Sequence, residues 1–254
     1  MKKTIKLLLK IFFALLLSII VYFAYIKINS DKLWKIINQE CIPNFKNGNL
    51  QTSCIKVDQQ HRYVIYKDIN GPLHNLLLPL DKISGIESPI LQQKNTKNYF
   101  TLAWQNRELL VKSASNPINE QFLSLAINSK YGRTQDQLHI HLACLKPEIY
   151  QIIKKNEHTI TSNWRPLPLK DRINNHEYLA IKISTSDINK ISPFNYLEKY
   201  TVEHDDNIAY YGLAMMPSAQ QNKFILLTTR LKLQDFNLGS VGLIQDYLCK
   251  LSDN

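Results

Sequence analysis

The sequence lacks several features that would place it in other classes of protein. No internal repeat or low-complexity tract occurs in its 254 residues, which argues against a repeat array or a disordered chain. No stripe of lysine and arginine is interleaved with aromatic residues, so nucleic-acid binding has little support. No break in composition divides residues 31–254. These absences favour one domain that is large enough to bury its own core.

Charge is also missing from Ile11 to Ile26, and acidic residues are missing from residues 1–30. With the three leucines at 7–9, the apolar run reaches about 20 residues, roughly the length of helix that crosses a bilayer. Five lysines stand in residues 1–30, so the net charge of +10 leaves +5 for residues 31–254. That mildly basic domain suits an anionic substrate or a membrane surface.

Lysines at positions 2, 3 and 6 precede the apolar run, so the N-terminus is expected to stay in the cytoplasm. A cleaved signal peptide is the competing interpretation, but no small-x-small cleavage site follows the run. We therefore expect residues 1–30 to form a cytoplasmic tip and one transmembrane signal-anchor, with membrane contact through residues 7–26. Residues 31–254 would form the exported domain.

The chain has four cysteines, an even number that suits two disulfides in an oxidising compartment. They are Cys41, Cys54, Cys144 and Cys249. Their spacing alone does not choose among the three possible connectivities. The short polar loop between the first two favours Cys41–Cys54, which leaves Cys144–Cys249. Four unpaired buried thiols are the alternative.

The pattern of apolar residues predicts an α+β domain with helices packed on an antiparallel sheet. Strands are expected at residues 62–69, 76–80, 122–127, 138–145, 178–181, 210–216 and 224–229, the last two as a hairpin. A turn at Gly132 is expected to join the third and fourth of these strands. Helices are expected at residues 31–40, 97–112 and 148–156, the last opened by Pro147.

Two histidines, His139 and His141, alternate with aliphatic residues, which is the period of a β-strand. Both imidazoles would leave one face of that strand. Zinc binding would need a third ligand, and the other histidines stand at no diagnostic spacing, so no metal is expected. A polar strand face without a role is a second interpretation. The third is nucleophilic catalysis on phosphorus, because a neutral imidazole is a good nucleophile near neutral pH.

The stretch from Gly132 to His141 resembles the histidine triad (HIT) superfamily, whose signature His-φ-His-φ-His-φ-φ follows Gly-Gln-Ser/Thr. Anchored on Gly132 and Thr134, the register puts Gln137 at the first triad position, His139 at the second and His141 at the third. The resemblance implies a HIT-like antiparallel sheet, His139 as the nucleophile and His141 as a phosphate contact. It implies no cofactor.

The same resemblance assigns further substrate or phosphate contacts. Arg133 occupies the place of a polar glutamine, and Asn128 matches an upstream asparagine. Residues 63–79 resemble the strand–turn–strand of the superfamily, where His74 would line the pocket; a solvent-facing turn histidine is the alternative. Gln137 replaces a histidine, but the family holds the nucleophile's Nδ1–H with the backbone carbonyl at that position, which any residue supplies. Its side chain is expected to help bind the phosphates.

A narrower resemblance covers most of the chain. The apolar N-terminus, the four cysteine positions and six further segments resemble the bacterial CDP-diacylglycerol pyrophosphatase family; the segments are residues 66–73, 85–89, 125–129, 164–168, 176–180 and 211–215. The resemblance implies hydrolysis of CDP-diacylglycerol to CMP and phosphatidate through a nucleotidyl-histidine, by a domain that faces the periplasm from the bacterial inner membrane. It admits a homodimer. Turnover of soluble nucleotide conjugates, or a non-catalytic exported binding module, are the alternatives.

Overall fold

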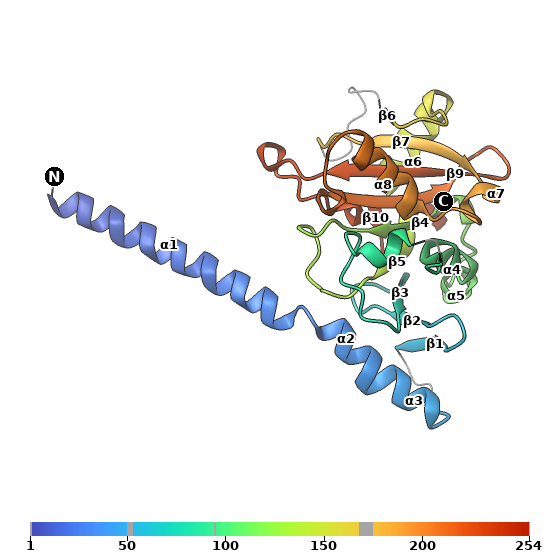
Figure 1. The fold of residues 1–254 in the computed structure, drawn as a ribbon, viewed down its shortest axis with the longest axis horizontal. Helices are drawn as coiled ribbons and strands as arrows, with labels where there is room; N and C mark the ends of the chain where they lie inside the picture. Colours follow the sequence, from blue (N-terminus) through green and yellow to red (C-terminus); the bar gives the residue numbers. More distant parts are fainter. Residues whose placement is uncertain (1, 50–52, 94, 168–174, 254) are drawn as a thin grey trace.

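A long N-terminal helix leads into an α+β domain (Figure 1). The computed structural model describes residues 2–49, 53–93, 95–167 and 175–253. The helices are α1 Lys2–Asn29, α2 Lys32–Ile36, α3 Ile42–Lys46, α4 Tyr99–Gln105, α5 Glu108–Val111, α6 Pro147–Asn156, α7 Thr185–Ile188 and α8 Pro193–Glu203. A π-helical turn at Ile37–Cys41 joins α2 to α3.

An antiparallel sheet forms the centre of the domain. Its strands are β1 Cys54–Asp58, β2 Tyr63–Lys67, β3 His74–Pro79, β4 Leu123–Ile127, β5 Ile140–Leu145, β6 Arg165–Pro166, β7 Leu179–Ser184, β8 Tyr211–Pro217, β9 Lys223–Arg230 and β10 Gln245–Asp246. Their order is β1-β2-β3-β5-β4-β8-β9-β7-β6, with β10 paired to β5. The predicted fold class, an antiparallel sheet with packed helices, is confirmed.

Most of the expected elements form, and the differences concern a strand boundary, one broken helix and elements that the sequence did not predict, among them α3, α7, β6 and β10. The strand expected from residue 138 begins at Ile140. The helix expected at residues 97–112 is two helices, because the buried side chain of Asn106 caps the first by donating to the carbonyl of Leu102 and to the hydroxyl of Tyr63. The edge strand β1 and the helix α8 were not predicted.

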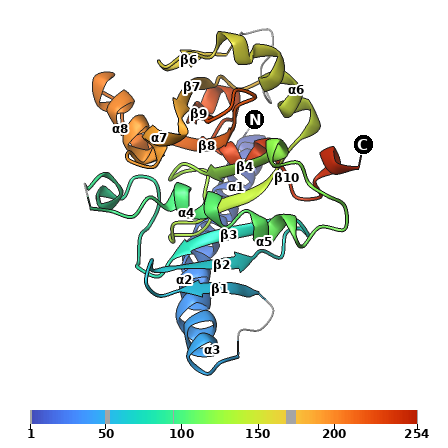
Figure 2. The ribbon, with the colours of Figure 1, turned by 90° about the vertical axis from the view of Figure 1, so that its right-hand side faces the viewer.

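The two faces of the sheet are covered differently. One face carries a continuous apolar core beneath α4, α5, α7 and α8. The other carries two separate apolar clusters, one under α2 and the π-helical turn at the β1–β3 end, and one under α6 and the C-terminal segments. Figure 2 shows α2 and α3 at one end of the sheet and α6 at the other. We call the face with two separate clusters the divided face, and the face with one apolar core the continuous face.

The histidine strand crosses the gap between the two clusters. The register aligns Leu76 of β3 with His141 of β5, and His141 with Ala126 of β4. Leu76 belongs to one cluster and Ala126 to the other. Leu138, Ile140 and Leu142 point into the continuous core, as alternation predicts. The imidazole of His141 therefore lies on the divided face, between the two clusters.

Two disulfides tie this arrangement together. Cys41–Cys54 links the π-helical turn to β1, and Cys144–Cys249 links β5 to the C-terminal segment. The favoured pairing is confirmed, and it fits an oxidising compartment.

The apolar N-terminal segment is helical throughout α1, as predicted. Large hydrophobic side chains from Ile5 to Tyr22 are exposed on it. In the described part of the chain, this is the one helix that is long and apolar enough to cross a membrane.

Candidate active site

His139 precedes β5 by one residue and is held by the backbone next to it. Its Nδ1 lies 2.6 Å from the carbonyl oxygen of Gln137. A carbonyl only accepts, so Nδ1 carries the proton and Nε2 is left with its lone pair. This is the contact that the HIT resemblance assigns to the first triad position. The side chain of Gln137 plays no part in it, because its Nε2 donates to the carbonyls of Pro79 and Asp81.

His141 is joined to a second histidine from the neighbouring strand. Its Nδ1 lies 2.8 Å from Nε2 of His74, and the two rings lie edge to edge in nearly one plane, with centroids 5.0 Å apart and planes 5° apart. Tyr247 stacks on a face of the His74 ring, with centroids 3.8 Å apart. Nδ1 of His74 lies 3.3 Å from Oδ1 of Asp68, somewhat long for a hydrogen bond. The result is a row that runs from Asp68 through His74 to His141.

His74 is therefore not the solvent-facing turn histidine that the sequence left open. Its side chain is 1% exposed. It reaches this position because β3 begins at His74 and pairs antiparallel with β5, with Leu76 opposite His141. The β2–β3 turn brings Asp68 back against the same ring.

Burial sets the protonation states of the site. Burial lowers the pKa of His139, and the positive charge of Arg133 adds to this against the hydrogen bond to Gln137. Burial also lowers the pKa of His141, well below its usual value, with further contributions from His139 and His74. Both imidazoles are thus neutral at neutral pH. Burial alone would raise the pKa of Asp68, but the neighbouring imidazole of His74 and hydrogen bonds from Asn70 bring it to about 2, so the carboxylate is ionised.

A cavity of about 280 Å³ opens beside these imidazoles. His139 and His141 line it together with residues of the β2–β3 turn, the segment before β5 and the helix α2; the other lining residues are Lys32, Leu33, Ile36, Tyr66, Asp68, Ile69, Asn70, Leu76, Thr134 and Gln135. One wall is therefore polar and acidic, and another is an apolar helix. That helix starts three residues after α1 ends.

Four of the residues expected to contact substrate or phosphate lie outside this lining: His74, which stands behind His141, and Arg133, Asn128 and Gln137. The guanidinium of Arg133 pairs with Glu87 at 2.5 and 2.8 Å and is 3.3 Å from Asp136. Asn128 Oδ1 accepts from the backbone N–H of Gly242. The amide of Gln137 is committed to backbone carbonyls, as described above. In this structure the side chains of Arg133, Asn128 and Gln137 support the loops around the site.

Sequence reasoning missed several residues of the cavity. Asp68 is the main one, and the signal for it was an acid six residues before His74 in a strand–turn–strand. Gln135 and the α2 residues gave no such signal, nor did Tyr247, which stacks on His74 behind the cavity, because their positions depend on packing between distant segments.

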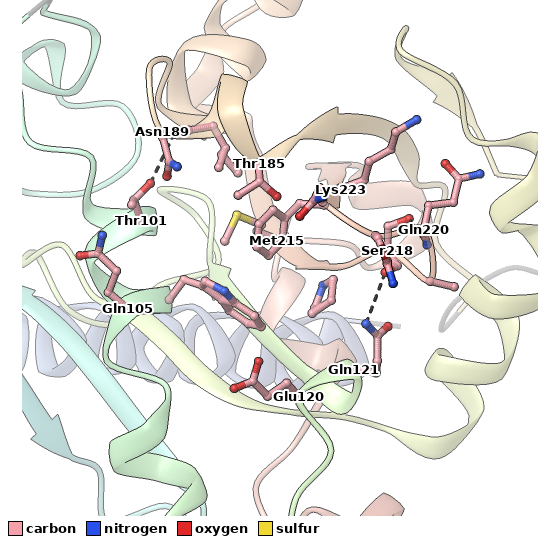
Figure 3. Close-up of a pocket in the computed structure, with 17 residues that line it drawn as sticks. Thr101, Gln105, Glu120, Gln121, Thr185, Asn189, Met215, Ser218, Gln220 and Lys223 are labelled. Atoms are coloured by element: carbon pink, nitrogen blue, oxygen red, sulfur yellow. Dashed lines mark hydrogen bonds between the residues drawn. The ribbon is translucent and has the colours of Figure 1, made fainter.

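A larger cavity of about 480 Å³ lies on the continuous face (Figure 3). Its labelled side chains are amides, hydroxyls and a thioether, with Glu120 and Lys223 at the margins. No histidine or cysteine is found among the described residues that line it. Its buried hydroxyl, Ser218, donates to the carboxylate of Glu157.

The fold and the divided-face cavity together define a class. Neutral imidazoles that face a substrate-sized space, with an ionised carboxylate behind one of them, are typical of enzymes that use histidine chemistry. Residues 28–253 match the family model described as CDP-diacylglycerol pyrophosphatase. The chain belongs to this family, which is a family of hydrolases, and CDP-diacylglycerol is the substrate that follows from it. The narrower resemblance is thus confirmed.

Solved structures with similar folds are more distant. An aprataxin ortholog, Hnt3, in complex with DNA is 16% identical, with a TM-score of 0.33; the match covers 48% of this chain and 66% of that one, just under two thirds. A DUF4931 family protein from Bacillus cereus ATCC 10987 is 12% identical, with a TM-score of 0.44, and the match covers 70% and 84% of the two chains.

Proposed function

We propose that the divided-face cavity hydrolyses CDP-diacylglycerol through a covalent CMP–His139 intermediate. The observation that carries this proposal is the imidazole of His139, which is neutral, lines the cavity and has Nδ1 held by the Gln137 carbonyl. Its Nε2 lone pair attacks the cytidylyl phosphorus. The bond from that phosphorus to the bridging oxygen breaks, and phosphatidate leaves with the electron pair.

The second step regenerates the enzyme. A water molecule attacks the phosphorus of CMP–His139, the P–N bond breaks and returns its electron pair to Nε2 of His139, and CMP leaves while a proton of the water is released to solvent. Overall, one water is consumed for each CMP and phosphatidate formed. The oxygen from water enters CMP.

The row Asp68–His74–His141 can hold one extra proton, which turns His141 into a hydrogen-bond donor to the substrate. With one extra proton on the His74–His141 pair, both nitrogens of His74 carry a proton. Its Nδ1–H then points to Asp68 and its Nε2–H donates to Nδ1 of His141, which leaves the proton of His141 on Nε2 as a donor. In the described part of the chain, Nε2 of His141 is buried and has no hydrogen-bond partner. A substrate phosphate oxygen is a fitting acceptor for it. Asp68 stabilises the proton on His74.

The apolar wall of the cavity suits a lipid substrate. Leu33 and Ile36 of α2 line the space beside the histidines, immediately after α1. We propose that α1 is an uncleaved anchor in the bacterial inner membrane and that the domain faces the periplasm, where its disulfides persist. Each acyl methylene holds the substrate in the bilayer by about 0.8 kcal/mol, so a tethered enzyme meets it there.

Substrate comparison in H₂¹⁸O tests this function. We expect the purified full chain in detergent micelles to convert CDP-diacylglycerol to CMP and phosphatidate, with ¹⁸O in CMP and a clear preference over water-soluble CDP-glycerol. Label in phosphatidate would contradict attack at the cytidylyl phosphorus. Equal turnover of both substrates would favour a hydrolase of soluble nucleotide conjugates, and turnover of neither would indicate a binding module.

A further inference from the structure

Phe236 is displayed to solvent in an unusual way. Its ring is 92% exposed, and its backbone is left-handed with φ of 52°. A bulky side chain is rarely found in that region of backbone space, and such strain persists only where the surroundings enforce it. An exposed phenyl ring on an enforced turn points to a partner that covers it.

The turn that carries Phe236 is firmly built. Lys232 and Asn237 exchange two backbone hydrogen bonds of 2.8 and 3.1 Å at its base. Asn237 is buried; its Nδ2 donates to Thr229 Oγ1 and its Oδ1 accepts from the N–H of Gly239, both at 2.7 Å. The ring is therefore held out by the fold.

Hydrogen bonds connect this turn, through the segment 129–136, to the C-terminal end of α1. Ser129 donates to the carbonyls of Gly239 and Leu238, which joins the turn to the segment 129–136. At the other end of that segment, Gln135 donates to the carbonyl of Asn29, and the N–H of Asp136 donates to the carbonyl of Ser30. We call the combined surface of residues 28–30, 129–136 and 232–238 the rim.

The rim lies on the side of the domain from which α1 leaves. Figure 1 shows the red-orange segment after β9 extending toward the same side as α1, while α7 lies on the opposite side. Large side chains of the rim are exposed there: Ile28 76%, Tyr131 48%, Leu233 67%, Phe236 92% and Leu238 44%. The exposed ammonium of Lys130 stands among them.

We infer that the rim is a second membrane contact, in which Phe236 and Leu233 enter the interface of the bilayer that α1 crosses. Aromatic and aliphatic side chains gain free energy at that depth, and a lysine beside them suits anionic head groups. Because Gln135 belongs both to the rim and to the cavity, this contact would hold the cavity mouth at the lipid surface. The inference rests on the membrane location in the proposed function.

Depth-dependent fluorescence quenching tests the contact without requiring activity. Phe236→Trp and the matched control Ile191→Trp would be placed in the full chain and reconstituted into vesicles of brominated phosphatidylcholine. Ile191 is 46% exposed and follows α7. After subtraction of the parent signal, which comes from three tryptophans, we expect strong quenching of the residue-236 emission only. Equal quenching of the two would overturn the inference, as would none at residue 236.

Kinetics in vesicles provide the second readout. Phe236→Asp should raise the apparent KM for CDP-diacylglycerol about tenfold, the equivalent of about 1.4 kcal/mol of lost interfacial binding. It should leave kcat unchanged, and Ile191→Asp should change neither value. An unchanged KM for Phe236→Asp would contradict the inference. If the parent hydrolysed nothing, the proposed function would fail while the quenching result still decided the membrane contact.

Discussion

The two faces of the sheet differ both in the size of their cavities and in the side chains that line them, and the larger cavity is not the one that holds the paired histidines. The continuous face has the larger cavity, about 480 Å³, and its lining mixes amides and hydroxyls with apolar side chains but includes no histidine among the described residues. The divided face has the smaller one, about 280 Å³, where two buried imidazoles meet an ionised carboxylate. The histidines line this cavity at the gap between the two apolar clusters of that face.

Substitution of one residue in each cavity should show most clearly which of the two cavities carries the activity. His139→Ala removes the nucleophile and should lower kcat for CDP-diacylglycerol at least about a thousandfold. Gln105→Ala, an exposed helical position in the larger cavity, should leave kcat unchanged. Steady-state assays with matched thermal melts would check both. Full activity of His139→Ala would end the assignment, and a large loss for Gln105→Ala would move attention to the continuous face.

Replacing a carboxylate by an amide at two positions tests the role of the row Asp68–His74–His141. Asp68 and Asp206 both have a pKa lowered to about 2, Asp68 against its burial by the neighbouring imidazole of His74 and hydrogen bonds from Asn70, and Asp206 mainly by Arg230. Asp68→Asn removes the negative charge that stabilises a proton on His74 and should lower kcat about a hundredfold. Asp206→Asn, which faces no histidine of the site, should keep kcat within about twofold. Equal effects would assign Asp68 a purely structural part.

The pH profile gives a smaller but specific effect. Burial lowers the pKa of His139, so its imidazole stays neutral as the pH falls to its usual value of about 6.5. Protonation at still lower pH removes the attacking lone pair. Therefore the acid limb of kcat/KM that belongs to His139 should have its midpoint below about pH 6.5. An acid limb with its midpoint above about 6.5 would contradict a buried, neutral nucleophile.

Local sequence patterns predicted the strand faces and the disulfide pairing, but they did not predict contacts between residues that are far apart in the sequence. Alternation placed the histidines and the aliphatic residues on opposite faces, and cysteine spacing favoured the observed pairing. The partner of Arg133 is Glu87, 46 positions away, so its ion pair could not be read from the motif. The same holds for α2, whose apolar side was predictable while the cavity that it lines was not. The break at Asn106 likewise depends on Tyr63, 43 positions away.

Capture of the covalent intermediate tests the central claim most directly. The full chain would be mixed with CDP-diacylglycerol, quenched within milliseconds at alkaline pH because phosphoramidates are labile to acid, and digested for mass spectrometry. We predict one cytidylyl group on the peptide that contains His139, absent from His139→Ala and removed in time by water. Hydrolysis of CDP-diacylglycerol at full rate with no such adduct, or an adduct that persists in His139→Ala, would contradict His139 as the nucleophile.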